Sequence, residues 1–341
     1  MLILVTGSTG FIGSHLCRTL VADGHTVRAF HRESSPLKLL ENLQAEHVIG
    51  DVTDTGSLQI AMQDVEVVYH TAAKLGQKRN LESIYKPTVS GTRNVLLAAI
   101  NAGVKRFVHT SSVAALGVPS ETQLSGMDQD YSQLLMDENH TWNFPPQHWR
   151  YGHAKYLAEI EVQKAVAKGL DAVILNPAAV LGPGDINQIS GGVIVHAARR
   201  GLPVAAPGGL NVVHIEEVVR GHLAAYKRGR TGERYILGGE NLSIKQFEGI
   251  VAEVVGVSPP KRVIPTRVLR ALSRPVSSLG NIFPLPIAGE ALHKAGYYFF
   301  YDTSKMVQEL GIEITHSTRE CVQDTYNWYR ENKIIKLEEY K

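Results

Sequence analysis

The stretch Thr6-Gly7-Ser8-Thr9-Gly10-Phe11-Ile12-Gly13 joins an apolar run at residues 2–6 to a helical pattern that begins at residue 13. In a strand-to-helix turn with this GxxGxxG spacing, the first glycine makes the tight turn and the second lets the backbone approach a pyrophosphate. The third lets the helix pack closely on the strand. Free N–H groups at the helix N-terminus attract anions. A glycine-rich turn without a ligand is the alternative, but the position favours a dinucleotide loop made of Gly7, Thr9, Gly10, Phe11, Ile12 and Gly13.

Short apolar runs alternate with helical patterns outward from this loop. They predict strands at residues 2–6, 25–31, 45–50, 65–71, 106–111 and 172–176. They predict helices at residues 13–23, 36–44, 55–62, 83–102 and 151–168. Such alternation builds βαβ units, whose right-handed crossovers cover both faces of a parallel sheet. The predicted fold class is α/β, a doubly wound parallel sheet (Rossmann fold) with a smaller α+β C-terminal substrate domain.

The regular alternation of strands and helices ends after Pro177, where glycine, proline and asparagine interrupt shorter elements. Helices are predicted there at residues 244–255, 267–272, 304–310 and 318–332. A length of 341 residues favours about two domains. We expect a dinucleotide-binding domain at 1–176 and a smaller substrate-binding region at 177–332, some segments of which return to the first domain. The charged tail at 333–341 should fray.

Composition excludes several classes of protein. The hydrophobic share of 44% and the charged share of 20% are those of an ordinary globular chain. A net charge of +2 gives no sign of a nucleic-acid surface, and no run of 18 apolar residues or signal-peptide pattern occurs. Only Cys17 and Cys321 are present, and the 14 histidines show no ligand motif. We therefore expect a cytoplasmic protein without a metal site.

The end of the second predicted strand bears on the choice of dinucleotide. An NAD enzyme usually places Asp or Glu there to hold the ribose hydroxyls, but this chain has Arg32. Arginine is a bidentate phosphate ligand, so NADP is favoured, while NAD stays open because Glu33 could serve the ribose. Asp51 and Val52 would receive the adenine, and a turn role for Asp51 is equally open.

Ser112, Tyr151 and Lys155 form the candidate catalytic set. Tyr151 and Lys155 are four residues apart on one helical face, and Ser112 follows a strand end, where an α/β sheet presents its ligands. Hydride transfer to a carbonyl needs a proton donor, but a phenol with a pKa of about 10 ionises reluctantly at neutral pH. An adjacent ammonium would favour the phenolate, and Ser112 would hold the substrate oxygen.

Taken together, these motifs make the chain resemble the extended short-chain dehydrogenases/reductases, the NAD-dependent epimerase/dehydratase family. The resemblance covers nearly the whole chain. It implies that Tyr151 donates the proton and that Lys155 also holds the nicotinamide ribose. It further implies that the cofactor lies along Ala72, Ala73, Pro177 and Val180. In one departure, Thr88 stands where the family usually has Asn, so a hydrogen bond to the active-site loop is lost or remade.

Residues 137–142, within a 39-residue separation of Ser112 from Tyr151, resemble the dihydroflavonol and cinnamoyl-CoA reductase branch of this family. Residues 232–241 resemble bacterial dihydroflavonol-reductase-like proteins and the hopanoid-associated sugar epimerase-like group. Residues 208–212 lack the basic side chain that nucleotide-sugar enzymes use to bind a diphosphate, unless another loop supplies it. The expected pocket wall is apolar and consists of Leu75, Leu116, Trp142, Val180, Ile186, Val193 and residues 284–291, although many of these residues could equally belong to the core.

The sequence therefore predicts an NADP(H)-dependent oxidoreductase that reduces a carbonyl compound to an alcohol. One alternative is a nucleotide-sugar epimerase or dehydratase that uses tightly bound NAD. A second alternative is a non-catalytic dinucleotide-sensing protein. The expected partner is a small-molecule carbonyl or alcohol, and the resemblance implies a homodimer through residues 83–102 and 151–168.

Overall fold

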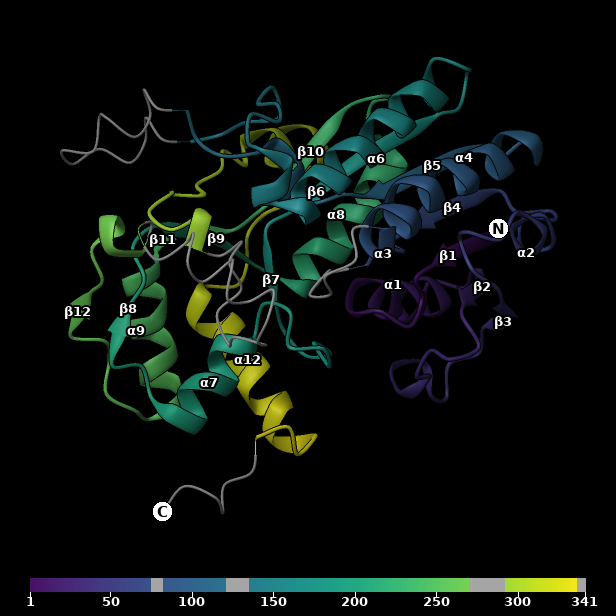
Figure 1. Ribbon diagram of the computed structural model, residues 1–341. Coiled ribbons are helices and arrows are strands. Elements are labelled where there is room, and N and C mark those ends of the chain that lie inside the picture. The colour runs from purple at the N-terminus through teal and green to yellow at the C-terminus, as the bar shows by residue number, and fades with distance from the viewer. Residues whose placement is uncertain (75–81, 121–134, 270, 272–291, 336–341) are drawn as a thin grey trace.

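A seven-stranded parallel sheet forms the centre of the computed structural model, which describes residues 1–74, 82–120, 135–269, 271 and 292–335 (Figure 1). Every strand pair in it is parallel. The spatial order is β10 (Arg234–Leu237), β6 (Ala172–Pro177), β5 (Arg106–Thr110), β4 (Val67–His70), β1 (Leu2–Thr6), β2 (Thr26–His31) and β3 (Glu46–Ile49).

Helices cover both faces of this sheet. One apolar core contains residues of α1 (Phe11–Ala22) and α8 (Ile215–Arg228) packed on the strands. A second core on the other face contains residues of α2 (Thr55–Ala61), α4 (Gly91–Asn101) and α6 (Arg150–Val166). Two separate cores around one parallel sheet are the signature of a doubly wound fold. The predicted fold class is confirmed.

The later part of the chain builds a smaller set of layers beside the main sheet (Figure 1). It contains a three-stranded sheet of β11 (Glu240–Ser243), β9 (Gly209–His214) and β7 (Ala179–Leu181), and the pair β8 (Val204–Ala205) and β12 (Arg262–Val263). Three helices share a third apolar core, α7 (Gly192–Arg200), α9 (Ile244–Val255) and α12 (Thr318–Glu331). Ser243 and Ser317 begin α9 and α12 with reciprocal capping boxes.

Two predicted helices differ from the structure. The helix expected at 36–44 is only a 3₁₀ turn at Lys38–Leu40, because Leu40 alone of its leucines is buried and a helix there would have no apolar face to cover. The helix expected at 83–102 is α3 (Glu82–Tyr85), a π-helical turn at Lys86–Ser90 and then α4. Pro87 cannot donate a helical hydrogen bond, which accounts for the break.

The remaining predicted helices end close to the expected residues. Residues 244–255 form α9 as predicted, residues 318–332 form α12 one residue shorter, and residues 304–310 end in a π-helical turn at Met306–Leu310. The helix expected at 267–272 and the tail at 333–341 lie partly outside the described residues. None of the described helices has the length and apolarity needed to cross a membrane.

Candidate functional site

The glycine loop leaves no space for side chains at two of its positions. Gly7 has a φ of +70°, and a Cβ on it would lie 2.7 Å from the backbone nitrogen of Ala72. A Cβ on Gly13 would collide with the carbonyl oxygen of Gly7, and that same oxygen accepts the backbone N–H of Gly10 at 2.9 Å. The loop is therefore drawn tightly between β1, α1 and the end of β4.

The N-terminus of α1 fits a dinucleotide pyrophosphate. No side chain caps this helix at Gly10, and its first turn contains no acidic residue. The only described atom near a Cβ placed on Gly10 would be the Gly7 carbonyl oxygen, at 3.2 Å. The first N–H groups of α1 thus face an open approach with a positive helix end, as an anion requires.

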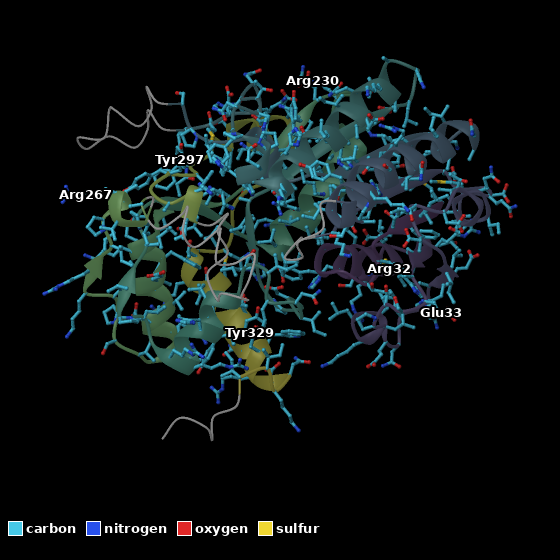
Figure 2. All side chains as sticks on the ribbon, viewed as in Figure 1. Arg32, Glu33, Arg230, Arg267, Tyr297 and Tyr329 are labelled. Carbon is cyan, nitrogen blue, oxygen red and sulfur yellow. The ribbon has the colours of Figure 1, made fainter. Side chains whose placement is uncertain are left out.

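The residues predicted to bind the adenosine part of the dinucleotide differ in exposure and in hydrogen-bond partners. Arg32 and Glu33 are exposed at the end of β2 (Figure 2), and the described residues include no hydrogen-bond or ion-pair partner for the Arg32 guanidinium. Asp51 Oδ1 already accepts from the backbone N–H and the hydroxyl of Thr53, each at 2.8 Å, so Asp51 does hold a turn. Asp54, rather than Asp51, caps α2. Val52 is buried against Gly91, on which a Cβ would lie 2.6 Å from Val52 Cγ2.

Tyr151 and Ser112 meet because α6 packs closely on the 3₁₀ turn Val113–Leu116 that follows β5. Gly152 permits this approach, since a Cβ there would lie 2.7 Å from the carbonyl oxygen of Ala114. The Ser112 hydroxyl lies close enough to the Tyr151 phenol to act on its ionisation. Burial raises the pKa of Tyr151 to about 12, and the Ser112 hydroxyl opposes this rise. The phenol is therefore protonated at neutral pH.

Lys155 lies one turn further along α6 and is buried. Its Nζ donates to the carbonyl oxygen of Thr110, the last residue of β5, at 2.8 Å. Burial lowers the pKa of Lys155 to about 8, and the charge of Glu159 opposes this decrease. The structure thus brings all three predicted catalytic residues to the carboxyl end of β5.

Buried histidines behind this strand end are neutral structural groups. The Thr92 hydroxyl donates to the Thr88 carbonyl oxygen at 2.6 Å, so it accepts from His70 Nε2 at 2.9 Å. His70 Nδ1 then accepts from the Thr6 hydroxyl at 2.7 Å. Burial lowers the pKa of His70 to about 3, and burial also holds the pKa of His109 well below its usual value. His70 has no part to play as a base at neutral pH.

The sequence model of the NAD dependent epimerase/dehydratase family matches residues 3–238. The chain belongs to this family. A Synechocystis sp. protein named "Putative dihydroflavonol 4-reductase" is 35% identical, over 98% of this chain and 96% of the relative. The "Sterol demethylase protein B" of Methylococcus capsulatus is 33% identical, over 98% of this chain and 100% of the relative. The crystal structure of gox2253 matches with a TM-score of 0.84 and 33% identity, over 98% of this chain and 99% of that chain.

This extended short-chain dehydrogenase/reductase is therefore an oxidoreductase, and its family binds an NAD(P) dinucleotide. The predicted resemblance is confirmed. Its departure at residue 88 has a structural outcome, because Thr88 is buried in the π-helical turn and its hydroxyl has no hydrogen-bond partner among the described residues. Within the described residues, Thr88 forms no hydrogen bond in place of the one expected from an Asn.

The other predicted cofactor residues lie along the carboxyl edge of the sheet. Ala72 and Ala73 follow β4, and Pro177 ends β6. Val180 is buried in the core that contains α1 and α8.

The predicted substrate residues of this oxidoreductase occupy different surroundings. Trp142 belongs to the apolar cluster that contains Tyr151, and its ring contacts those of Trp149, His153 and Tyr156. Ile186 is half-buried in the loop between β7 and α7, whereas Val193 packs against the third core. Leu116 is buried with Met136, Ile236 and Tyr301. Leu75 and residues 284–291 lie outside the described residues.

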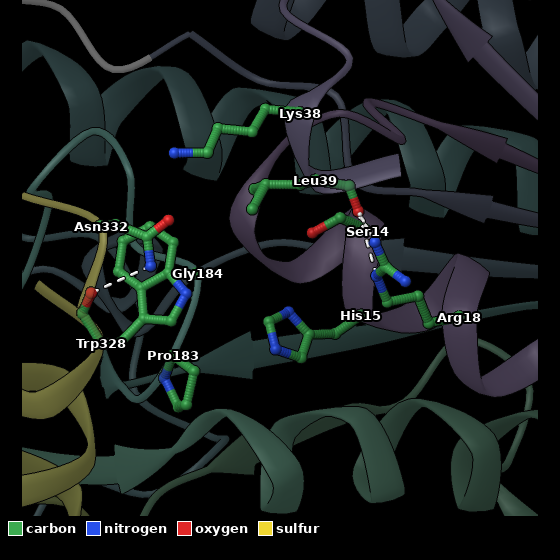
Figure 3. A pocket seen from close by; sticks show the side chains of 9 residues that line it. All are labelled: Ser14, His15, Arg18, Lys38, Leu39, Pro183, Gly184, Trp328 and Asn332. Carbon is green, nitrogen blue, oxygen red and sulfur yellow. Dashed lines mark hydrogen bonds between the residues drawn. The ribbon is translucent and has the colours of Figure 1, made fainter. Parts of the chain in front are cut away.

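A pocket of about 250 Å³ lies between α1 and α12 (Figure 3). His15 and Lys38 reach it from one side and Trp328 and Asn332 from the other, and Figure 3 also shows Arg18 bonded to Leu39. None of its lining residues belongs to the predicted catalytic set.

One cluster in the described part of this chain has metal-ligand composition, namely His214, Glu217 and His316, whose ligand atoms lie within 4.8 Å of one another. The two imidazoles are stacked at 4.1 Å with an interplanar angle of 21°. Their in-plane lone pairs therefore run side by side and do not converge on one ion. His316 Nδ1 is also bonded to Glu217 Oε1 at 2.7 Å, so the cluster is a packing contact between α8 and the start of α12.

Proposed function

We propose that this protein reduces a carbonyl compound to an alcohol with NADP(H). The observation that carries the proposal is the Ser112 hydroxyl beside a protonated, half-buried Tyr151, with the buried Lys155 one helical turn away and bonded to the end of β5. A reduced nicotinamide supplies hydride when it is bound. The residues of the glycine loop would hold its pyrophosphate, and Arg32 would hold a 2′-phosphate.

In this proposal Tyr151 donates its phenolic proton to the developing alkoxide, and Ser112 holds the same oxygen by a hydrogen bond. Lys155 stabilises the phenolate that remains, because an ammonium nearby lowers the cost of the negative charge. The high pKa of Tyr151 suits the reductive direction, since the proton is in place before substrate binds. Trp142 and the aromatic side chains around it would hold the apolar body of the substrate.

The Synechocystis relative is named a dihydroflavonol 4-reductase, which supports a reductase. The family also contains epimerases and dehydratases, so a nucleotide-sugar epimerase or dehydratase is the second candidate. The two differ in net redox change. We expect NADPH absorbance at 340 nm to fall in the presence of aromatic, terpenoid or aliphatic ketones and aldehydes. Conversion of a nucleotide-sugar without net NADPH consumption would favour the epimerase or dehydratase. Tight NADPH binding with neither reaction would favour the dinucleotide sensor.

A further inference from the structure

Glu159 is a fully buried acid one turn beyond Lys155 and two turns beyond Tyr151 on the same face of α6. Its Oε1 accepts from the Ser111 hydroxyl at 2.5 Å and from the Asn176 side-chain amide at 2.6 Å. Its Oε2 lies 2.8 Å from Arg234 Nε. Burial raises the pKa of this carboxyl, while the charge of Arg234 and the hydrogen bonds from Ser111 and Asn176 oppose the rise and favour the ionised form.

These partners come from the ends of neighbouring strands. Ser111 follows β5, Asn176 is near the end of β6 and Arg234 begins β10. The Asn176 side-chain amide also donates to the backbone carbonyl oxygen of Ser112 at 2.9 Å. One carboxylate therefore joins three strands and, through Asn176, fixes the backbone that carries Ser112.

The same carboxylate dominates the charge around Lys155. Tyr151 precedes Lys155 on α6, His70 and His109 face it from β4 and β5, and these three are uncharged at neutral pH. His222 of α8 bonds the Thr110 hydroxyl at 2.7 Å, and burial lowers its pKa to about 4, so it is also neutral. Arg234 pairs with the Glu159 carboxylate. Among the described groups that act on Lys155, Glu159 supplies the negative charge.

We propose that Glu159 is a positioning residue that keeps Lys155 in its ammonium form and fixes Ser112 in place, so that one buried acid supports both neighbours of Tyr151. This rests on the proposed function for the roles of Lys155 and Ser112. The carboxylate touches neither the substrate oxygen nor the cofactor in this scheme. It acts through the charge of one residue and the backbone of the other.

The decisive variant is Glu159→Gln, which keeps an acceptor for Ser111 and removes the charge. Proteins carrying ¹³Cε-labelled lysine are titrated by NMR, with the Lys155 signal assigned by its absence in Lys155→Met. We expect the titration midpoint of Lys155 to fall by about one pH unit in Glu159→Gln. Glu161→Gln is the matched control, because Glu161 lies on the same helix and pairs with the half-exposed Arg93 and Lys164. It should leave the midpoint unchanged.

An unchanged midpoint in a folded Glu159→Gln protein would overturn the inference, whatever the enzyme reduces. If that variant does not fold, Glu159→Gln/Arg234→Gln removes both charges of the pair together, and the midpoint of Lys155 should again fall, by less than in Glu159→Gln because a cation is lost as well. A shifted midpoint without any carbonyl reduction by the wild type would leave the charge support intact and defeat only the proposed function. Where a carbonyl substrate is found, kcat of Glu159→Gln should fall increasingly with pH between 7 and 9, while KM for NADPH changes less than threefold.

Discussion

Lys155 donates a hydrogen bond from Nζ to the main-chain carbonyl oxygen of Thr110 over 2.8 Å. The lysine is therefore held by the backbone at the last residue of β5. The Thr110 hydroxyl bonds His222 Nε2 at 2.7 Å, and His222 Nδ1 donates to the Val218 carbonyl oxygen at 2.7 Å. Helices on both faces of the sheet thus fix the strand end from which the candidate site is built.

The proton-donor role of Tyr151 predicts a loss of turnover in Tyr151→Phe. General acid catalysis contributes about 10²–10⁴-fold, and kcat should fall by that amount. NADPH affinity, measured by fluorescence titration, should stay within about threefold of wild type because the glycine loop is untouched. The control is Tyr226→Phe, which removes a hydroxyl that bonds only Met1 Sδ. Full activity in Tyr151→Phe would contradict the mechanism.

The exposed guanidinium of Arg32 predicts dinucleotide preference. Arg32→Asp removes a phosphate ligand and adds a negative charge, so NADPH should bind about 10- to 100-fold more weakly. NADH binding should weaken less or improve. Glu33→Gln, at the neighbouring exposed position, is the comparison and should lower NADPH affinity little. If the ratio of the NADPH and NADH dissociation constants were the same in Arg32→Asp and in wild type, Arg32 would not contact the 2′-phosphate.

Crowding at Gly13 and open space at Gly249 predict opposite outcomes for two Gly→Ala substitutions. In Gly13→Ala the new methyl group would collide with the Gly7 carbonyl oxygen, so dinucleotide binding should be lost and the protein destabilised. Gly249 lies within α9, and a methyl group added there would meet no atom within 4 Å. Gly249→Ala should therefore raise the free energy of unfolding by about 0.5–1 kcal/mol. Urea unfolding of both variants checks the pair, and a tolerated Gly13→Ala would count against the tight loop.

The contact of His316 with Glu217 and the stacked His214 predicts that the packing of α8 against α12 stabilises the protein in a pH-dependent way. Burial acts to lower the pKa of His316, but the hydrogen bond and charge of Glu217 outweigh it and raise the pKa. The stabilisation is thus fully present below the unfolded pKa of about 6.5 and is lost as pH rises through the folded pKa. Relative to wild type, His316→Gln should cost about 1 kcal/mol at pH 5.5 and less at pH 9. Urea midpoints that differ equally at both pH values would show that His316 acts by packing alone.

The unpartnered hydroxyl of Thr88 predicts that a polar group can be removed from the core without loss. Thr88→Val replaces the hydroxyl by a methyl group of similar size and should leave the protein equally stable or more stable, by up to about 1 kcal/mol. Thr92→Val is the contrasting variant, since the Thr92 hydroxyl bonds both the Thr88 carbonyl oxygen and His70. It should be clearly destabilised in thermal unfolding, and a reversed order would mean that Thr88 has a partner in the folded protein.

Local patterns in the sequence predicted six of the seven strands of the main sheet and the helix that carries Tyr151 and Lys155. The central strands β1, β4, β5 and β6 are apolar runs whose burial on both faces leaves little freedom of assignment, whereas the edge strand β3 is mostly exposed. The seventh strand, β10, was not predicted, because its apolar run is only Tyr235, Ile236 and Leu237 and it lies in the less regular part of the chain after Pro177. The helix at 36–44 was wrong because leucines close together in sequence need a surface to cover, and local spacing does not show whether that surface exists.

The polar supports of the site could not be found in the same way. Glu159 has the spacing of Tyr151 and Lys155, which could have placed it on their face, but an acid in a helix is usually solvated. Its burial depends on Arg234, which is remote in the sequence and reaches it only through the pairing of β10 with β6. Pairing between distant segments is a property of the folded chain.

The position of Arg234 has a consequence for how the protein is made. A fragment that ended at residue 176 would contain the glycine loop, Ser112, Tyr151 and Lys155, yet its Glu159 would lack the neutralising cation. An uncompensated acid in the interior is strongly destabilising. We therefore expect the site to reach its final packing only after β10 has paired with β6 and brought Arg234 to Glu159.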